Sequence, residues 1–251
     1  MRRDGPFHHL DRDLRFHRLD PDEIIATATT LSQRIEERFP GSGLAAVCRE
    51  LIGAARKATV TVDWLARPHY LLRITAGVII AIMVAGIVLI LSQLKLRLTI
   101  EALSELLQAL DAGVNNVVFF VVAVFFLSNW ETRRKRALAL RSLHTLRSLA
   151  HIVDMHQLTK DPDRIVPGPD TPSSPDRPMT AFELTRYLDY CSEMLSLIAK
   201  VAALHVQQFD DPATITAVTD MENLTSGLSR KIWQKIMLLD RIVVPPGDHA
   251  G

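Results

Sequence analysis

The stretch FFVVAVFFLSNWETRRKR, residues 119–136, passes from an apolar run through Trp130 into four consecutive basic residues. Apolar runs without charge fill the hydrocarbon part of a bilayer, while tryptophan and basic residues are typical of its cytoplasmic boundary. The stretch therefore predicts a membrane exit, with the basic residues on the cytoplasmic side.

Two segments have the composition of membrane spans. Residues 74–94 carry no charge, and at about 1.5 Å per residue they cover the roughly 30 Å of hydrocarbon. The alternative for this segment is a buried core helix. Residues 113–130 have a shorter apolar core, for which a soluble core segment or a re-entrant loop is the alternative. Trp130 and the basic block favour a span, and an isolated strand in lipid would leave its backbone unsatisfied, so we expect two helices.

The distribution of basic residues predicts the orientation. Two basic residues, Lys95 and Arg97, lie between the spans, beside acidic residues. Many more flank the pair: Arg56, Lys57, Arg67 and Arg73 before it, and Arg133, Arg134, Lys135, Arg136, Arg141 and Arg147 after it. The positive-inside rule then places both termini in the cytoplasm and the short connection outside. We expect the membrane to be the inner membrane of a bacterium. We expect Trp130, Arg133, Arg134, Lys135 and Arg136 to contact lipid headgroups.

The chain has no strand pattern and no internal repeat, so the predicted fold is all-α: a two-span helical hairpin with a cytoplasmic bundle built from N- and C-terminal segments. The expected order is a charged N-terminus (1–19), cytoplasmic helices (20–73), a span (74–94), an extracytoplasmic amphipathic connection (95–112), a span (113–130), a cytoplasmic helix (131–160), a proline-rich linker (161–179), a cytoplasmic helical hairpin (180–244) and a tail (245–251). Gly113 is expected to end the amphipathic helix of the connection.

Helix starts and one heptad pattern support the bundle. DPDE at 20–23 and TAFE at 180–183 are capping boxes, and Asp211-Pro212 starts the last helix. Two apolar stripes run along the helix after TAFE, so it should be buried on two sides. The first stripe is Leu184, Leu188, Cys191, Leu195, Ile198, Ala202, His205 and Phe209, and the second is Tyr187, Tyr190, Met194, Leu197, Val201 and Leu204.

Polar residues near the outer end of the second span are candidates for a pore. Asn115 and Asn116 prefer a partner or water to lipid. They could line an outer pore mouth, or they could lie in the headgroup zone. Gly77, Ala81 and Ala85 form a stripe of small residues that lets another helix approach closely.

A polar face on the helix after the second span is a candidate for a metal or ligand. At 100° per residue, His144, His151 and Asp154 share one face. Two imidazoles and one carboxylate make an incomplete zinc site. The alternatives are a solvated polar face and a pH-sensing contact.

KIWQKI, residues 231–236, is a candidate for docking a protein partner. It presents Lys231 and Lys235 beside Trp233 on an amphipathic helix. The alternative is a solvated face on which the tryptophan anchors the helix. His205 lies in an apolar stripe, where a core histidine is more common than a ligand.

Composition and motifs argue against other classes. The formal charge of +1 gives no electrostatic case for nucleic acid. Cys48 and Cys191 are far apart, which argues against a disulfide framework. There is no phosphate loop, GxSxG or HExxH. We therefore predict no enzyme activity and no cofactor.

These features predict a homo-oligomeric channel or pore gated by its cytoplasmic bundle, because two spans cannot enclose a path alone. Its expected partners are membrane lipids, copies of itself and a cytoplasmic protein. The alternative is a membrane-anchored scaffold or adaptor whose bundle docks that protein. The layout is similar to that of two-span effector membrane proteins in bacterial defence systems, with no shared motif, and so it assigns no family.

Overall fold

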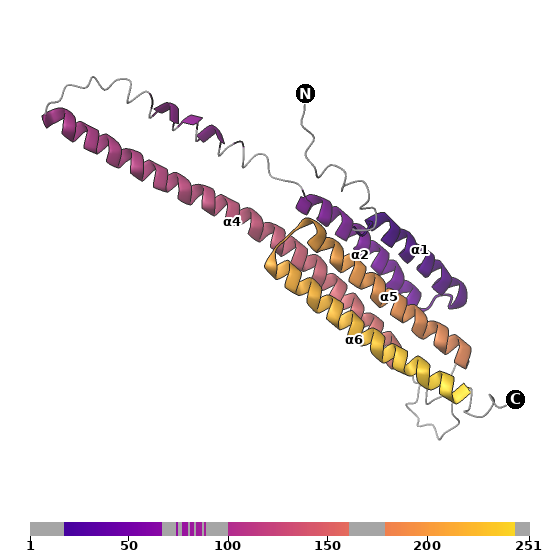
Figure 1. Ribbon diagram of the computed structural model, residues 1–251. Coiled ribbons are helices and arrows are strands. Elements are labelled where there is room, and N and C mark those ends of the chain that lie inside the picture. Colours follow the sequence, from indigo (N-terminus) through magenta and orange to yellow (C-terminus); the bar gives the residue numbers. More distant parts are fainter. Residues whose placement is uncertain are drawn as a thin grey trace, which may run out of the picture. The chain divides into compact units, whose positions relative to one another are not determined.

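The computed structural model describes residues 18–66, 100–160 and 179–243, with scattered positions between 74 and 88. The described elements are the helices α1 (Pro21–Arg38), α2 (Gly43–Ala66), α4 (Ile100–Leu158), α5 (Ala181–Gln208) and α6 (Pro212–Val243) (Figure 1). No strand occurs in this part of the chain, which confirms the all-α prediction. The expected charged N-terminus, proline-rich linker and C-terminal tail lie almost entirely outside the described residues.

The chain divides into two compact units. One consists of Met1–Ala66 with Leu138–Gly251, and the other is Arg67–Ala137. In the first unit, α1, α2, α5, α6 and the last part of α4 form a helical bundle (Figure 1). The second unit contains the first part of α4 and the described helical positions between 74 and 88.

Side-chain caps begin α1 and α5 where the sequence predicts them. Asp20 accepts the backbone N–H of Asp22 at 2.9 Å, with Pro21 in the first turn of α1. At α5, Thr180 accepts the N–H of Glu183 at 3.2 Å while Glu183 accepts the N–H of Thr180 at 2.8 Å, which completes the capping box. Each cap supplies an acceptor to N–H groups that have no partner within the helix.

A side-chain cap also starts α6, and a glycine turn follows α1. Asp211 accepts the N–H of Thr214 at 3.1 Å, and Pro212 opens α6. Gly41 has a φ of 66° in the short turn between α1 and α2. This left-handed conformation costs glycine little because it has no Cβ.

Helix α5 is the centre of the bundle, and α1, α2 and α6 pack against it. Both predicted stripes of α5 are buried, except that Phe209 at its end is half-buried. Leu188, Leu195 and Ile198 are fully covered, at 0% exposure. The stripes therefore supply a large part of the apolar surface whose burial drives the bundle together.

One prediction about α4 is wrong. Gly113 does not end a helix, because α4 runs without interruption from Ile100 to Leu158. From residue 100 onward, the expected connection, second span and following helix thus form one continuous helix. Glycine inside a helix costs about 1 kcal/mol, which the hydrogen bonds of the turns on both sides offset.

Within the described residues, no helix has both the length and the apolar character needed to cross a membrane.

Candidate functional site

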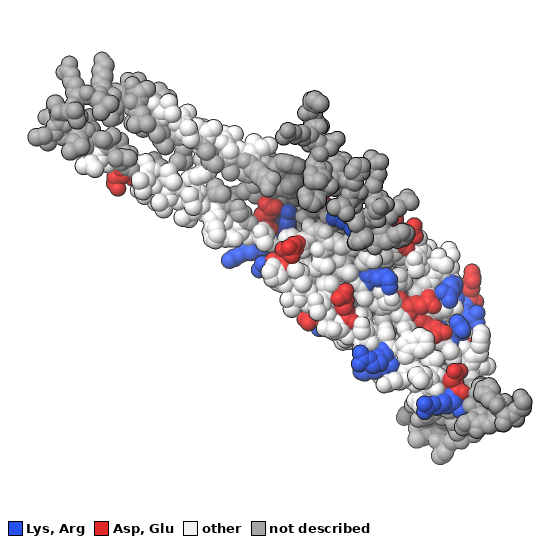
Figure 2. Space-filling view, viewed as in Figure 1, with Lys and Arg blue, Asp and Glu red and all other residues white. Residues whose placement is uncertain are grey.

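The middle of α4 is an apolar surface whose described side chains are largely exposed. Residues 112–130 contain no charged side chain, and Figure 2 shows this part of α4 as uncharged surface. Its described apolar side chains include Val118, Phe119, Val122 and Phe125, which are exposed by 54%, 69%, 58% and 68%. At 100° per residue Val118, Val122 and Phe125 lie within about 60° of one another, and Phe119 lies beside them on the same side of the helix. Exposure of such an apolar surface to water would be unfavourable.

The described positions between 74 and 88 have the same character. Ile74, Val78, Ile82 and Val88 are exposed by 61%, 52%, 66% and 59%. Gly77, Ala81 and Ala85 are also exposed. A Cβ added to Gly77 would meet nothing within 4 Å, so no described residue of this chain packs on it.

Of the two candidate pore residues, the structure describes the side chain of Asn115 alone. Asn115 is exposed on α4. The backbone of Asn116 belongs to α4, but its side chain lies outside the described part.

The basic side chains after Trp130 differ in their exposure. Trp130, Arg133 and Arg134 are exposed, and Trp130 packs edge-to-face on Phe126 at a centroid distance of 6.0 Å. Lys135 is only 8% exposed and its Nζ lies 3.0 Å from a carboxylate oxygen of Glu131. The sequence predicted that Lys135 contacts lipid headgroups, but its side chain is buried and paired within α4. Arg136 is half-buried.

A hollow of about 500 Å³ follows the exposed side of α4 around Trp130. Its lining is mostly apolar and consists of Phe125, Phe126, Asn129, Trp130, Arg133, Arg134 and Ala137. These residues are three or four apart in sequence, so they lie on one side of α4.

The predicted metal face gains no support. His144 and His151 are exposed, and Asp154 accepts a hydrogen bond from the Gln157 amide at 2.6 Å. Among the described residues, no three His, Cys, Asp or Glu side chains are close enough to hold one metal ion. The three residues form a polar helix face on which Asp154 has a protein partner.

The cysteines lack the features of nucleophiles. Burial raises the pKa of the Cys48 thiol to about 11 and that of Cys191 to about 12. Both thiols are therefore protonated at neutral pH and closed to reagents.

Lys235 of the predicted docking patch has a role inside the bundle. Its Nζ donates to the carbonyl of Gln157 at 2.9 Å and to that of Lys160 at 3.3 Å. Gln157 lies in the last turn of α4 and Lys160 lies two residues after its end, where a positive charge also interacts favourably with the helix dipole. Lys231 and Trp233 are exposed on α6. The patch is thus reduced to these two residues.

We predict that Lys235→Met destabilises the bundle by about 1.5–3 kcal/mol, because a charged donor is lost from two carbonyls. Lys231→Met is the matched control on the same helix and should change stability by less than about 0.5 kcal/mol. Thermal unfolding of the full chain in detergent, followed by circular dichroism, measures both. Equal effects of the two substitutions would contradict a capping role for Lys235.

Two histidines are held in an environment that favours their neutral form. His205 is 0% exposed and its Nδ1 contacts the carbonyls of Val201 and Ala202, each at 3.2 Å. Burial lowers the pKa of His205 despite these contacts. Burial, and then Lys160, lowers the pKa of His156, whose Nδ1 lies 3.5 Å from the Tyr187 hydroxyl.

We predict that the bundle loses stability on acidification. The unfolded histidines bind protons near their usual pKa of 6.5, above the pKa of the folded ones. Stability is therefore complete above about pH 6.5 and declines as the pH falls through the folded pKa values. The double variant His156→Gln/His205→Leu should flatten this decline, while His151→Gln, at an exposed position, should keep it. The measurement is the unfolding midpoint of each variant between pH 8 and pH 5. If the midpoint of the double variant falls with pH as steeply as that of the unaltered chain, these two histidines do not cause the loss of stability.

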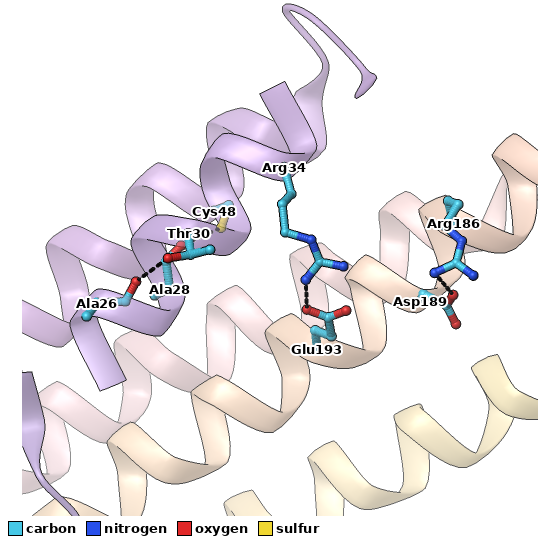
Figure 3. A network of polar contacts seen from close by, with 8 residues as sticks. All are labelled: Ala26, Ala28, Thr30, Arg34, Cys48, Arg186, Asp189 and Glu193. Atoms are coloured by element: carbon cyan, nitrogen blue, oxygen red, sulfur yellow. Dashed lines mark hydrogen bonds and ion pairs between the residues drawn. The ribbon is translucent and has the colours of Figure 1, made fainter. Parts of the chain in front are cut away.

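A second hollow, of about 550 Å³, lies between α1 and α5. It is lined by Arg34, Glu37, Arg38, Phe182, Arg186 and Tyr190. Arg34 pairs with Glu193 across the two helices at 3.0 Å, and Arg186 pairs with Asp189 at 3.3 Å on α5 (Figure 3). The Arg38 and Arg186 guanidinium groups lie 5.3 and 5.8 Å from the exposed Phe182 ring.

The sequence did not predict this hollow. Its residues come from two helices more than a hundred positions apart, and each alone resembles an ordinary amphipathic surface. The TAFE capping box placed Phe182 in the first turn of α5, and that was the one available signal.

Comparisons of the chain with protein-family models, with curated proteins and with solved structures found no match.

Proposed function

We propose that the protein is an integral membrane protein whose residues 74–94 and 113–130 cross a bacterial inner membrane, with both termini in the cytoplasm. In this proposal several copies form a pore that the helical bundle gates. The observation that carries it is α4, which continues from an exposed apolar segment into the bundle core without a loop.

The length of the uncharged part of α4 supports the membrane assignment. Asp111 and Glu131 bracket residues 112–130. At about 1.5 Å per residue this part is about 28 Å long, close to the roughly 30 Å of hydrocarbon. Lipid is the environment in which the exposure of these valine and phenylalanine side chains is favourable. Much of residues 74–94 lies outside the described part of the chain.

Continuity of α4 supports gating. Its C-terminal part buries Ala139, Leu143, Leu146 and Val153 at 3% exposure or less. A movement of the bundle would therefore reach the proposed span through helical hydrogen bonds instead of a flexible loop. A single pair of spans cannot enclose a path, so the pore requires several copies.

Copy number tests this function. Native mass measurement of the full chain in lipid nanodiscs should find a closed assembly of about four copies or more, and the same material in liposomes should release a trapped ion. A monomer or dimer without ion release would overturn the pore.

The second candidate is a membrane-anchored adaptor, and the hollow between α1 and α5 favours it. Arginine and aromatic residues are enriched at protein interfaces, and Phe182 is 59% exposed between two guanidinium groups. The described side chains of residues 113–130 include no charge that would line a conducting path. Under this function, Phe182→Ala would abolish capture of a cytoplasmic protein, and the membrane-bound chain would conduct nothing.

A further inference from the structure

We propose that the hollow along residues 125–137 of α4 binds one anionic phospholipid, with its phosphate at Arg133 and Arg134. This inference rests on the proposed membrane location and names a ligand for it. Neither the pore nor the adaptor function requires such a site.

The order of side chains along the hollow matches the order of groups in a phospholipid. Phe125 and Phe126 lie at one end, Asn129 and Trp130 follow, and Arg133 and Arg134 come next. Acyl chain, glycerol ester and phosphate show the same gradient from apolar through weakly polar to charged. The lining residues extend over about 18 Å at 1.5 Å per residue, which accommodates a headgroup and part of one chain.

Charge favours an anionic ligand. Two guanidinium groups line the hollow, and no carboxylate is among its described lining residues. The nearest acid in sequence, Glu131, pairs with Lys135 at 3.0 Å. Guanidinium groups form bidentate hydrogen bonds with phosphate oxygens.

The aromatic pair gives the hollow a fixed wall. Phe126 and Trp130 pack edge-to-face at 6.0 Å, one helical turn apart. Trp130 is 56% exposed, so its ring is accessible beside the two arginines. Tryptophan favours this interfacial depth because its ring is apolar while its N–H can donate to an ester or phosphate oxygen.

The experiment titrates delipidated full-length protein in detergent with phosphatidylglycerol, phosphatidylcholine and soluble glycerol phosphate, and counts bound molecules by native mass. Phosphatidylglycerol should bind far more tightly than either of the others. Arg133→Gln/Arg134→Gln should weaken that binding about 25-fold, since each basic residue at an anionic lipid surface contributes about fivefold. Arg141→Gln, a matched exposed arginine later in α4, should change it less than about twofold.

Three results would overturn the inference. Unchanged phosphatidylglycerol binding in the double variant would remove the arginines from the site. Equal binding of glycerol phosphate would show an anion site that needs no acyl chain. Disulfide trapping of two copies through Phe125→Cys in the presence of excess phosphatidylglycerol would show that a second copy occupies the hollow.

Membrane fractionation of the same variants separates this inference from the proposed function. Normal membrane recovery and copy number with lost lipid binding support the lipid site and leave the pore proposal unaffected. Recovery of the unaltered chain in the aqueous fraction would overturn the membrane proposal itself.

Discussion

Ile198→Asp is expected to unfold the helical bundle. Ile198 is 0% exposed in the middle of α5, the helix on which α1, α2 and α6 pack. An isolated carboxylate buried among apolar side chains costs roughly 4 kcal/mol or more, a large share of the stability of an ordinary domain. Circular dichroism and protease resistance of the full chain in detergent measure the loss.

Ser196→Asp is the control for this substitution. It adds the same carboxylate two residues earlier on α5, at an exposed position whose hydroxyl accepts a hydrogen bond from Lys200 at 2.6 Å. We expect a change of less than about 0.5 kcal/mol. Comparable unfolding by both variants would contradict the central position of α5.

Val122→Arg is expected to expel α4 from the membrane. Val122 lies near the middle of the uncharged part of α4 and is 58% exposed. An arginine at the centre of a span costs about 2.5–3.5 kcal/mol, which shifts insertion by about two orders of magnitude. The measurement is the fraction of the chain that stays with membranes after an alkaline wash.

Thr145→Arg places the same side chain at an exposed position later on α4. It should leave the chain in the membrane fraction, as should Val122→Leu. If Val122→Arg and Thr145→Arg partition alike, residues 113–130 do not lie in lipid.

The sequence predicted the helix starts and the central helix well because both depend on local rules. A capping box needs two residues three apart, and Thr180 with Glu183 satisfies it directly. The stripes of α5 repeat every three or four residues, and a helix with apolar residues on two sides has to be buried on both.

The sequence predicted less well those features that depend on contacts with other parts of the folded chain. Gly113 suggested a helix end, yet the turns on both sides continue through it. Lys235 was read with Trp233 as a surface patch, whereas it reaches the end of α4. A contact like that of Lys235 joins residues far apart in the chain, and the periodicity of one helix carries no information about it.

The most direct test of the central claim is the topology of α4, measured with a membrane-impermeant maleimide. The two natural cysteines are buried with raised pKa values, so introduced cysteines can be read against a low background. Gln108→Cys and Thr145→Cys lie at exposed positions before and after the proposed span. We predict labelling of Gln108→Cys in intact spheroplasts and labelling of Thr145→Cys only after permeabilisation. Equal labelling of both positions in intact spheroplasts, or equal protection of both, would contradict a membrane crossing by α4.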